Sequence, residues 1–71
     1  MSRQEWEDFI EENKKLFFNV FTDKATAKKQ FEAKKELVYL VRSRFGYNDR
    51  DDAFVINQCL AQWQLFKGAS V

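Results

Sequence analysis

The residues able to do acid–base or nucleophilic chemistry are few in this chain. It has no histidine, the commonest general base, and one cysteine, Cys59. Cys59 stands among apolar residues at helical spacing with no neighbouring cation to lower the pKa of its thiol, so we expect a small core residue. Phosphate-binding, dinucleotide and nucleophile-elbow motifs are also absent from the sequence. We therefore predict a protein that is not an enzyme and has no catalytic site or cofactor.

The candidate for a metal site is the acidic segment at residues 47–52, YNDRDD. A calcium loop needs Gly at its sixth position and Glu at its twelfth, and counting from Asp49 these positions hold Phe54 and Leu60. One cysteine without histidine cannot form a zinc site either. We predict no metal site and expect the carboxylates to stabilise a helix start.

A basic stripe is expected on the middle of the chain. Lys24, Lys28, Lys35 and Arg42 fall within a strip roughly 40° wide when projected at 100° per residue. Such a ridge can follow a phosphate backbone, so these four are candidate phosphate contacts. The alternative is a solvated helix edge, with Lys28 four residues from Glu32, where the two can pair. Because the net charge is only +1, the whole chain has no strong attraction for nucleic acid or anionic membrane.

The element that positions this stripe is a predicted central helix over residues 23–45. Its first part is rich in strong helix formers, Thr22 and Asp23 are cap types, and Gly46 is a typical helix stop. The residues expected on its core face are Ala27, Phe31, Val38, Val41 and Phe45.

A helix is predicted on either side, over residues 3–21 and 49–67. Ser2 and Glu5 fit a capping box, and Gly68 is expected to stop the last helix. Seven apolar residues of the first helix share one face: Trp6, Phe9, Ile10, Leu16, Phe17, Val20 and Phe21. The main face of the last helix holds Val55, Ile56, Cys59, Leu60, Trp63 and Phe66.

Two features of the first helix leave alternatives open. Asn13 lies near the centre of its apolar face, where it could bond to its mate across a dimer seam or to a neighbouring backbone group. The boundary after Phe21 carries neither Gly nor Pro, so the first two helices could be one kinked rod or a hairpin. In a hairpin, Glu12 and Glu5 would approach Arg42 and Arg44.

These elements predict an all-α fold, a compact three-helix bundle forming one domain over residues 1–71, with a helical homodimer as an option. A chain of 71 residues buries only about 60% of its unfolded surface. Even so, 45% of its residues are hydrophobic and 17% aromatic. After each helix has buried one face, Phe18, Tyr39, Leu40, Phe54 and Leu65 remain, and we predict a protein interface there. The alternative is that helix crossing angles bury some of them.

The sequence therefore predicts a small helical protein–protein interaction module, a regulator, inhibitor or adaptor of a larger protein that also self-associates. The alternative is a nucleic-acid-binding accessory protein that uses the basic stripe. No apolar run approaches the roughly 18 residues of a membrane span, and the first residues are acidic where a secretion signal is basic, so we expect a cytoplasmic protein without membrane contact. This size is common among regulators encoded by phages or mobile elements, which we keep as a hypothesis of origin.

Overall fold

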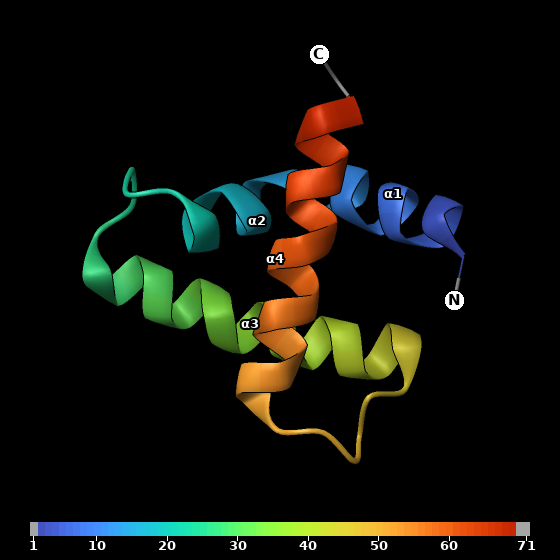
Figure 1. Cartoon of the computed structure of the whole chain (residues 1–71). Coiled ribbons are helices and arrows are strands. Elements are labelled where there is room, and N and C mark those ends of the chain that lie inside the picture. The colour runs from blue at the N-terminus through green and yellow to red at the C-terminus, as the bar shows by residue number, and fades with distance from the viewer. Residues whose placement is uncertain (1, 70–71) are drawn as a thin grey trace.

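The described part of the chain folds into four α-helices (Figure 1). The computed structural model describes residues 2–69, in which the helices span Arg3–Glu12 (α1), Lys14–Phe21 (α2), Ala27–Phe45 (α3) and Asp52–Ala69 (α4). The all-α prediction is confirmed. The prediction of three helices is wrong, because residues 3–21 form two helices rather than one.

Asn13 makes the break between α1 and α2. Its backbone N–H donates to the carbonyl oxygens of Phe9 and Ile10, both at 3.1 Å, and its side-chain Nδ2 donates to Phe9 O at 2.9 Å. The side chain of Asn13 thus shares the Phe9 carbonyl with the backbone, and the φ of −122° and ψ of 30° at Asn13 lie outside the helical range. Of the two interpretations of Asn13, the bond to a neighbouring backbone group is confirmed.

The predicted break after Phe21 is confirmed, but its chemistry differs from the expectation. Thr22 ends α2, with its backbone N–H and its hydroxyl both donating to Phe18 O. The N-cap of α3 is Thr26, whose Oγ1 accepts a bond from the N–H of Lys29 at 3.2 Å. The predicted start at residue 23 is therefore four residues too early.

Of the other predicted helix ends, two are confirmed and two are wrong. Ser2 caps α1, accepting a bond from the N–H of Glu5 at 3.2 Å. Gly46 ends α3 in the left-handed conformation, φ +74°, as predicted. The last helix begins at Asp52 instead of residue 49, because Asp51 Oδ1 accepts from the N–H of Phe54 at 2.8 Å. It continues past Gly68, so the predicted stop there is wrong.

The first three helices form a hairpin, and α4 crosses it. In Figure 1, α1 and α2 follow one another along one side, α3 returns along the other, and α4 crosses both steeply. The expected meeting of α1 with the end of α3 is found in one ion pair, Arg44 Nη1 to Glu12 Oε2 at 3.3 Å. Because α4 crosses rather than runs alongside α3, it covers only part of that helix.

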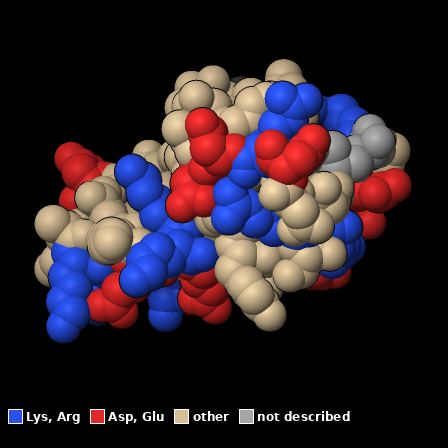
Figure 2. All heavy atoms as spheres, turned by 90° about the horizontal axis from the view of Figure 1, so that it is seen from below, with Lys and Arg blue, Asp and Glu red and all other residues tan. Residues whose placement is uncertain are grey.

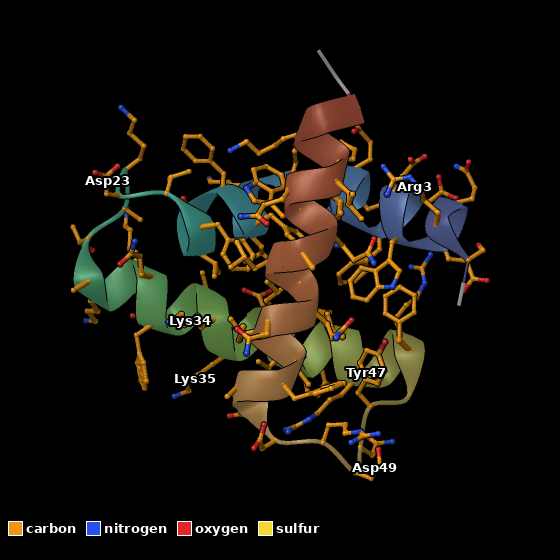
Figure 3. The ribbon with its side chains drawn as sticks, viewed as in Figure 1. Arg3, Asp23, Lys34, Lys35, Tyr47 and Asp49 are labelled. Atoms are coloured by element: carbon orange, nitrogen blue, oxygen red, sulfur yellow. The ribbon has the colours of Figure 1, made fainter. Side chains whose placement is uncertain are left out.

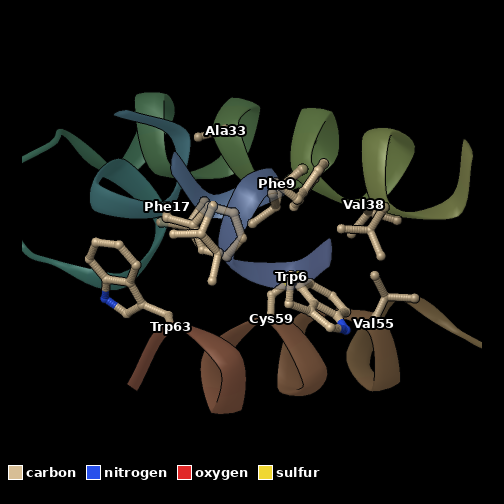
Figure 4. Packing of buried hydrophobic residues seen from close by; sticks show 12 residues of the cluster. Trp6, Phe9, Phe17, Ala33, Val38, Val55, Cys59 and Trp63 are labelled. Carbon is tan, nitrogen blue, oxygen red and sulfur yellow. The ribbon is translucent and has the colours of Figure 1, made fainter. Parts of the chain in front are cut away.

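The core lies where the four helices meet (Figure 4). Its members are Trp6, Phe9, Ile10, Phe17, Val20, Ala33, Leu37, Val38, Val41, Val55, Cys59 and Trp63. The predicted faces of the first and last helices are confirmed, since every member of them is buried or half-buried. Within residues 2–69, each helix is too short or too polar to cross a lipid bilayer.

Candidate functional site

A groove lies between α3 and the first turns of α4. Its larger part, of about 380 Å³, contains Phe31 and Lys34. A second part, of about 310 Å³, continues along α3 past Tyr39. Both parts are lined by Lys35, Val38 and Asp52, so they form one depression, which we call the α3/α4 groove.

The floor of the α3/α4 groove is apolar. Val38 is buried in the core, and Ile56 of α4 is half-buried and packed against it. Ala53 adds a small exposed side chain one turn before Ile56. An apolar floor beside exposed aromatic side chains is typical of a surface that another molecule covers.

Phe31 stands at the edge of the α3/α4 groove and is 56% exposed. The prediction that Phe31 and Ala27 belong to the core face of this helix is wrong, since both are exposed. Residues Ala33 and Leu37 occupy the core side instead, and the steep crossing of α4 leaves the Phe31 edge uncovered. A signal was present in the sequence, because Phe31 is the only large apolar residue in residues 28–35, KKQFEAKK.

The charge of the α3/α4 groove is divided between its two parts. At one end Arg42 Nη2 lies 2.8 Å from Asp52 Oδ1 and donates to the carbonyl oxygen of Arg50 at 2.6 Å. The carboxylate of Asp52 is thus offset by a guanidinium. At the other end Lys34 and Lys35 have no carboxylate partner among the described residues, and the Nζ of Lys35 lies 4.9 Å from the centre of the Phe31 ring.

Two views show where charged side chains lie. Figure 3 labels Lys34 and Lys35 on the part of α3 that leads away from its crossing with α4. In Figure 2, which looks from below, Lys and Arg side chains extend from the left edge across the middle of the molecule, with Asp and Glu between them. The uncompensated charge of the groove is therefore positive.

The five apolar residues predicted as an interface come from three helices and differ in exposure. Tyr39, Leu65 and Phe18 are 69%, 51% and 43% exposed and lie on three different helices. Leu40 and Phe54 are only half-buried, Leu40 against the core and Phe54 edge-on to the ring of Tyr47, at 5.8 Å between ring centres. Only Tyr39 of the five lines the α3/α4 groove. The role of all five as an interface stays a prediction.

The predicted basic stripe is divided by the structure. Lys28 and Lys35 are exposed on α3, but Lys24 lies in the connection before that helix, and Arg42 is engaged with Asp52 and Arg50. The expected pair of Lys28 with Glu32 is not among the ion pairs of residues 2–69. The prediction that these four cations share one strip of a single helix is thus wrong. Their contact with phosphate stays a prediction.

Cys59 is held inside the core. Its side chain is fully buried, and burial raises the pKa of the thiol from 9.0 to about 12. A thiol that stays protonated and enclosed is a poor nucleophile. Among residues 2–69, no group of three or more His, Cys, Asp or Glu side chains is placed to hold a metal ion.

Comparison of the chain with protein-family models, curated proteins and solved structures found no match.

Proposed function

We propose that this protein is a non-enzymatic helical module that binds a larger protein through the α3/α4 groove and so regulates, inhibits or bridges it. The observation that carries the proposal is Phe31, an aromatic side chain 56% exposed beside an apolar floor. Tyr39 adds a second exposed aromatic to the same groove. Aromatic side chains of this kind supply much of the binding energy at protein interfaces.

The polar groups of the α3/α4 groove support binding rather than catalysis. Asp52, the only carboxylate among the described residues that line the groove, is ion-paired with Arg42. The thiol of Cys59 is enclosed in the core. A cytoplasmic location is also part of the proposal.

Photo-crosslinking in the native host tests the proposal. A photoreactive phenylalanine analogue is placed at Phe31 or Tyr39, with Phe18 as the matched control because it is also exposed but lies outside the groove. We expect the first two positions to give the same protein adduct and position 18 to lack it. Equal adducts from all three positions, or no protein adduct at 31 and 39, would contradict the proposal.

Self-association is kept as an alternative form of this proposal. It is supported by the exposure of Phe18 and Leu65, large apolar side chains outside the groove. Light scattering over a wide concentration range measures it directly. A stable dimer would indicate that exposed apolar side chains form contacts between copies. A monomer would indicate that the groove binds a separate partner.

A nucleic-acid-binding accessory protein is the second candidate function. It is favoured by the exposed lysines Lys24, Lys28 and Lys35, which have no carboxylate partner among the described residues. Reversing the charge of Lys28 and Lys35 to Glu should then abolish binding to a DNA or RNA duplex and lower the dependence of affinity on salt. The candidate is rejected if the native protein binds no duplex at low salt.

A further inference from the structure

We propose that the occupant of the α3/α4 groove is an acidic amphipathic helix of the partner protein. This inference rests on the proposed function and adds the chemistry of the partner. Apolar side chains of that helix would lie on Val38 and Ile56, and its flanking carboxylates would pair with Lys34 and Lys35.

The apolar floor favours a helix over an extended segment. An extended peptide needs hydrogen bonds for its backbone, commonly from the edge of a sheet, and residues 2–69 contain no strand. A helix satisfies its own backbone groups and presents only side chains to a groove. From Phe31 to Arg42 the groove follows α3 for about 16 Å, enough for roughly three turns of a partner helix.

Charge complementarity makes that helix acidic. Lys34 and Lys35 are exposed and have no carboxylate partner within residues 2–69, whereas the Asp52 carboxylate already pairs with Arg42. Glutamate or aspartate one turn from the apolar anchors would meet the ammonium groups of Lys34 and Lys35. A basic segment would bring like charges together, which lowers affinity.

A nucleic-acid strand fits the α3/α4 groove less well. A phosphate backbone gains little from the apolar floor of Val38 and Ile56, and the Asp52 carboxylate lines the same groove. Lysines elsewhere on the surface remain available to phosphate under the second candidate function.

A second copy of the chain is also a poorer occupant. The acidic helix of this protein is α1, whose exposed carboxylates include Glu5, Asp8 and Glu11. The apolar face of α1, formed by Trp6, Phe9 and Ile10, is already buried in its own core. Without unfolding, α1 has no apolar anchors to place on the groove floor of another copy.

The test uses two fluorescent synthetic peptides and the intact protein. Both peptides are helical, with leucines along one face, and they differ only in carrying glutamates or lysines on the two flanks. Fluorescence anisotropy measures their affinities. We expect the glutamate peptide to bind at least about tenfold more tightly than the lysine peptide, and its affinity to fall as salt rises.

Variants of the protein locate the binding site. The double change Lys34→Glu with Lys35→Glu should reverse the preference between the two peptides. Phe31→Ser should lower the affinity for the glutamate peptide about tenfold. The matched controls are Lys15→Glu with Lys29→Glu, two exposed lysines outside the groove, and Phe18→Ser. The controls should leave the preference unchanged, and far-UV circular dichroism should show native helicity in all variants.

The outcomes separate this inference from the proposed function. Preference for the lysine peptide, no binding of either peptide, or equal effects of groove and control variants would overturn the acidic helix. The proposed function would still stand if positions 31 and 39 crosslink to the same protein. If those positions instead crosslink to a nucleic acid or to a second copy, the acidic helix is also overturned. Absence of any adduct together with absence of peptide binding would remove both.

Discussion

The Nζ of Lys35 lies 4.9 Å from the centre of the Phe31 ring, one helical turn away on the same edge of α3. This contact orients an aromatic ring that the core does not cover. A cation over an exposed ring contributes about 0.5–1 kcal/mol, far less than burial of a phenylalanine. Phe31 is therefore a residue whose removal should affect binding more than folding.

Truncation of Phe31 tests this difference. Phe31→Ala should lower the free energy of unfolding by less than about 1 kcal/mol, because only a surface contact is lost. Phe17→Ala, which empties a fully buried site, should cost about 3–5 kcal/mol. Urea unfolding followed by circular dichroism compares the two. Similar losses would place Phe31 in the core.

Removal of the Arg42 side chain should weaken the joint between α3 and α4. Arg42→Ala loses the bond to the Arg50 carbonyl and the ion pair with Asp52, so we expect the free energy of unfolding to fall by about 1–2 kcal/mol. The control is Arg44→Ala, which loses an exposed pair with Glu12 and should cost about 0.5 kcal/mol. Equal effects in chemical denaturation would show that the joint does not stabilise the fold.

The side-chain bond of Asn13 to Phe9 O gives a third prediction. Asn13→Ala should lower the free energy of unfolding by about 1 kcal/mol and leave the solution mass unchanged, because the bond lies within one chain. Asn19→Ala, in the middle of α2, should be neutral or slightly stabilising because alanine is the better helix former. A drop in solution mass specific to Asn13→Ala would place Asn13 at a seam between copies.

The two glycines should respond oppositely to alanine. Gly46 has φ +74°, so Gly46→Ala should cost about 1 kcal/mol through backbone strain alone, since no atom lies within 4 Å of the added Cβ. Gly68 lies inside α4 without a positive φ and with equal space, so Gly68→Ala should stabilise by up to about 1 kcal/mol. Thermal unfolding measures both, and a shift in the same direction would contradict the assignment.

The buried Cys59 thiol makes stability fall in alkaline solution. The unfolded chain releases this proton above about pH 9, whereas burial raises the pKa in the folded protein to about 12. The contribution is therefore complete below pH 9 and is lost as the pH rises toward 12. Between about pH 7 and pH 10.5 the native protein should lose about 1–2 kcal/mol more than Cys59→Ala. Urea unfolding at both pH values measures the difference, and equal losses would contradict it.

Much of the fold could be predicted because helical periodicity is a local property. The apolar faces of the first and last helices were predicted correctly from spacing alone, including Phe17, Cys59 and Trp63, which are all buried. The stop at Gly46 followed from the one residue type that adopts its backbone conformation without strain. The break at Asn13 was missed because Ile10 and Phe17 lie seven residues apart, so the apolar period continues through it.

The candidate site was less predictable. Tyr39, Lys35 and Arg42 were singled out from the sequence, but for different surfaces, and Phe31 was assigned to the core. Spacing places a residue on a face of its own helix, whereas the crossing of α4 decides which part of that face is covered. The sequence by itself determined the helices and most of the core, because these depend on near neighbours. Only the tertiary structure decided that Phe31 is exposed, that Arg42 pairs with Asp52 and that the α3/α4 groove exists. Each of these depends on how helices distant in sequence pack against one another.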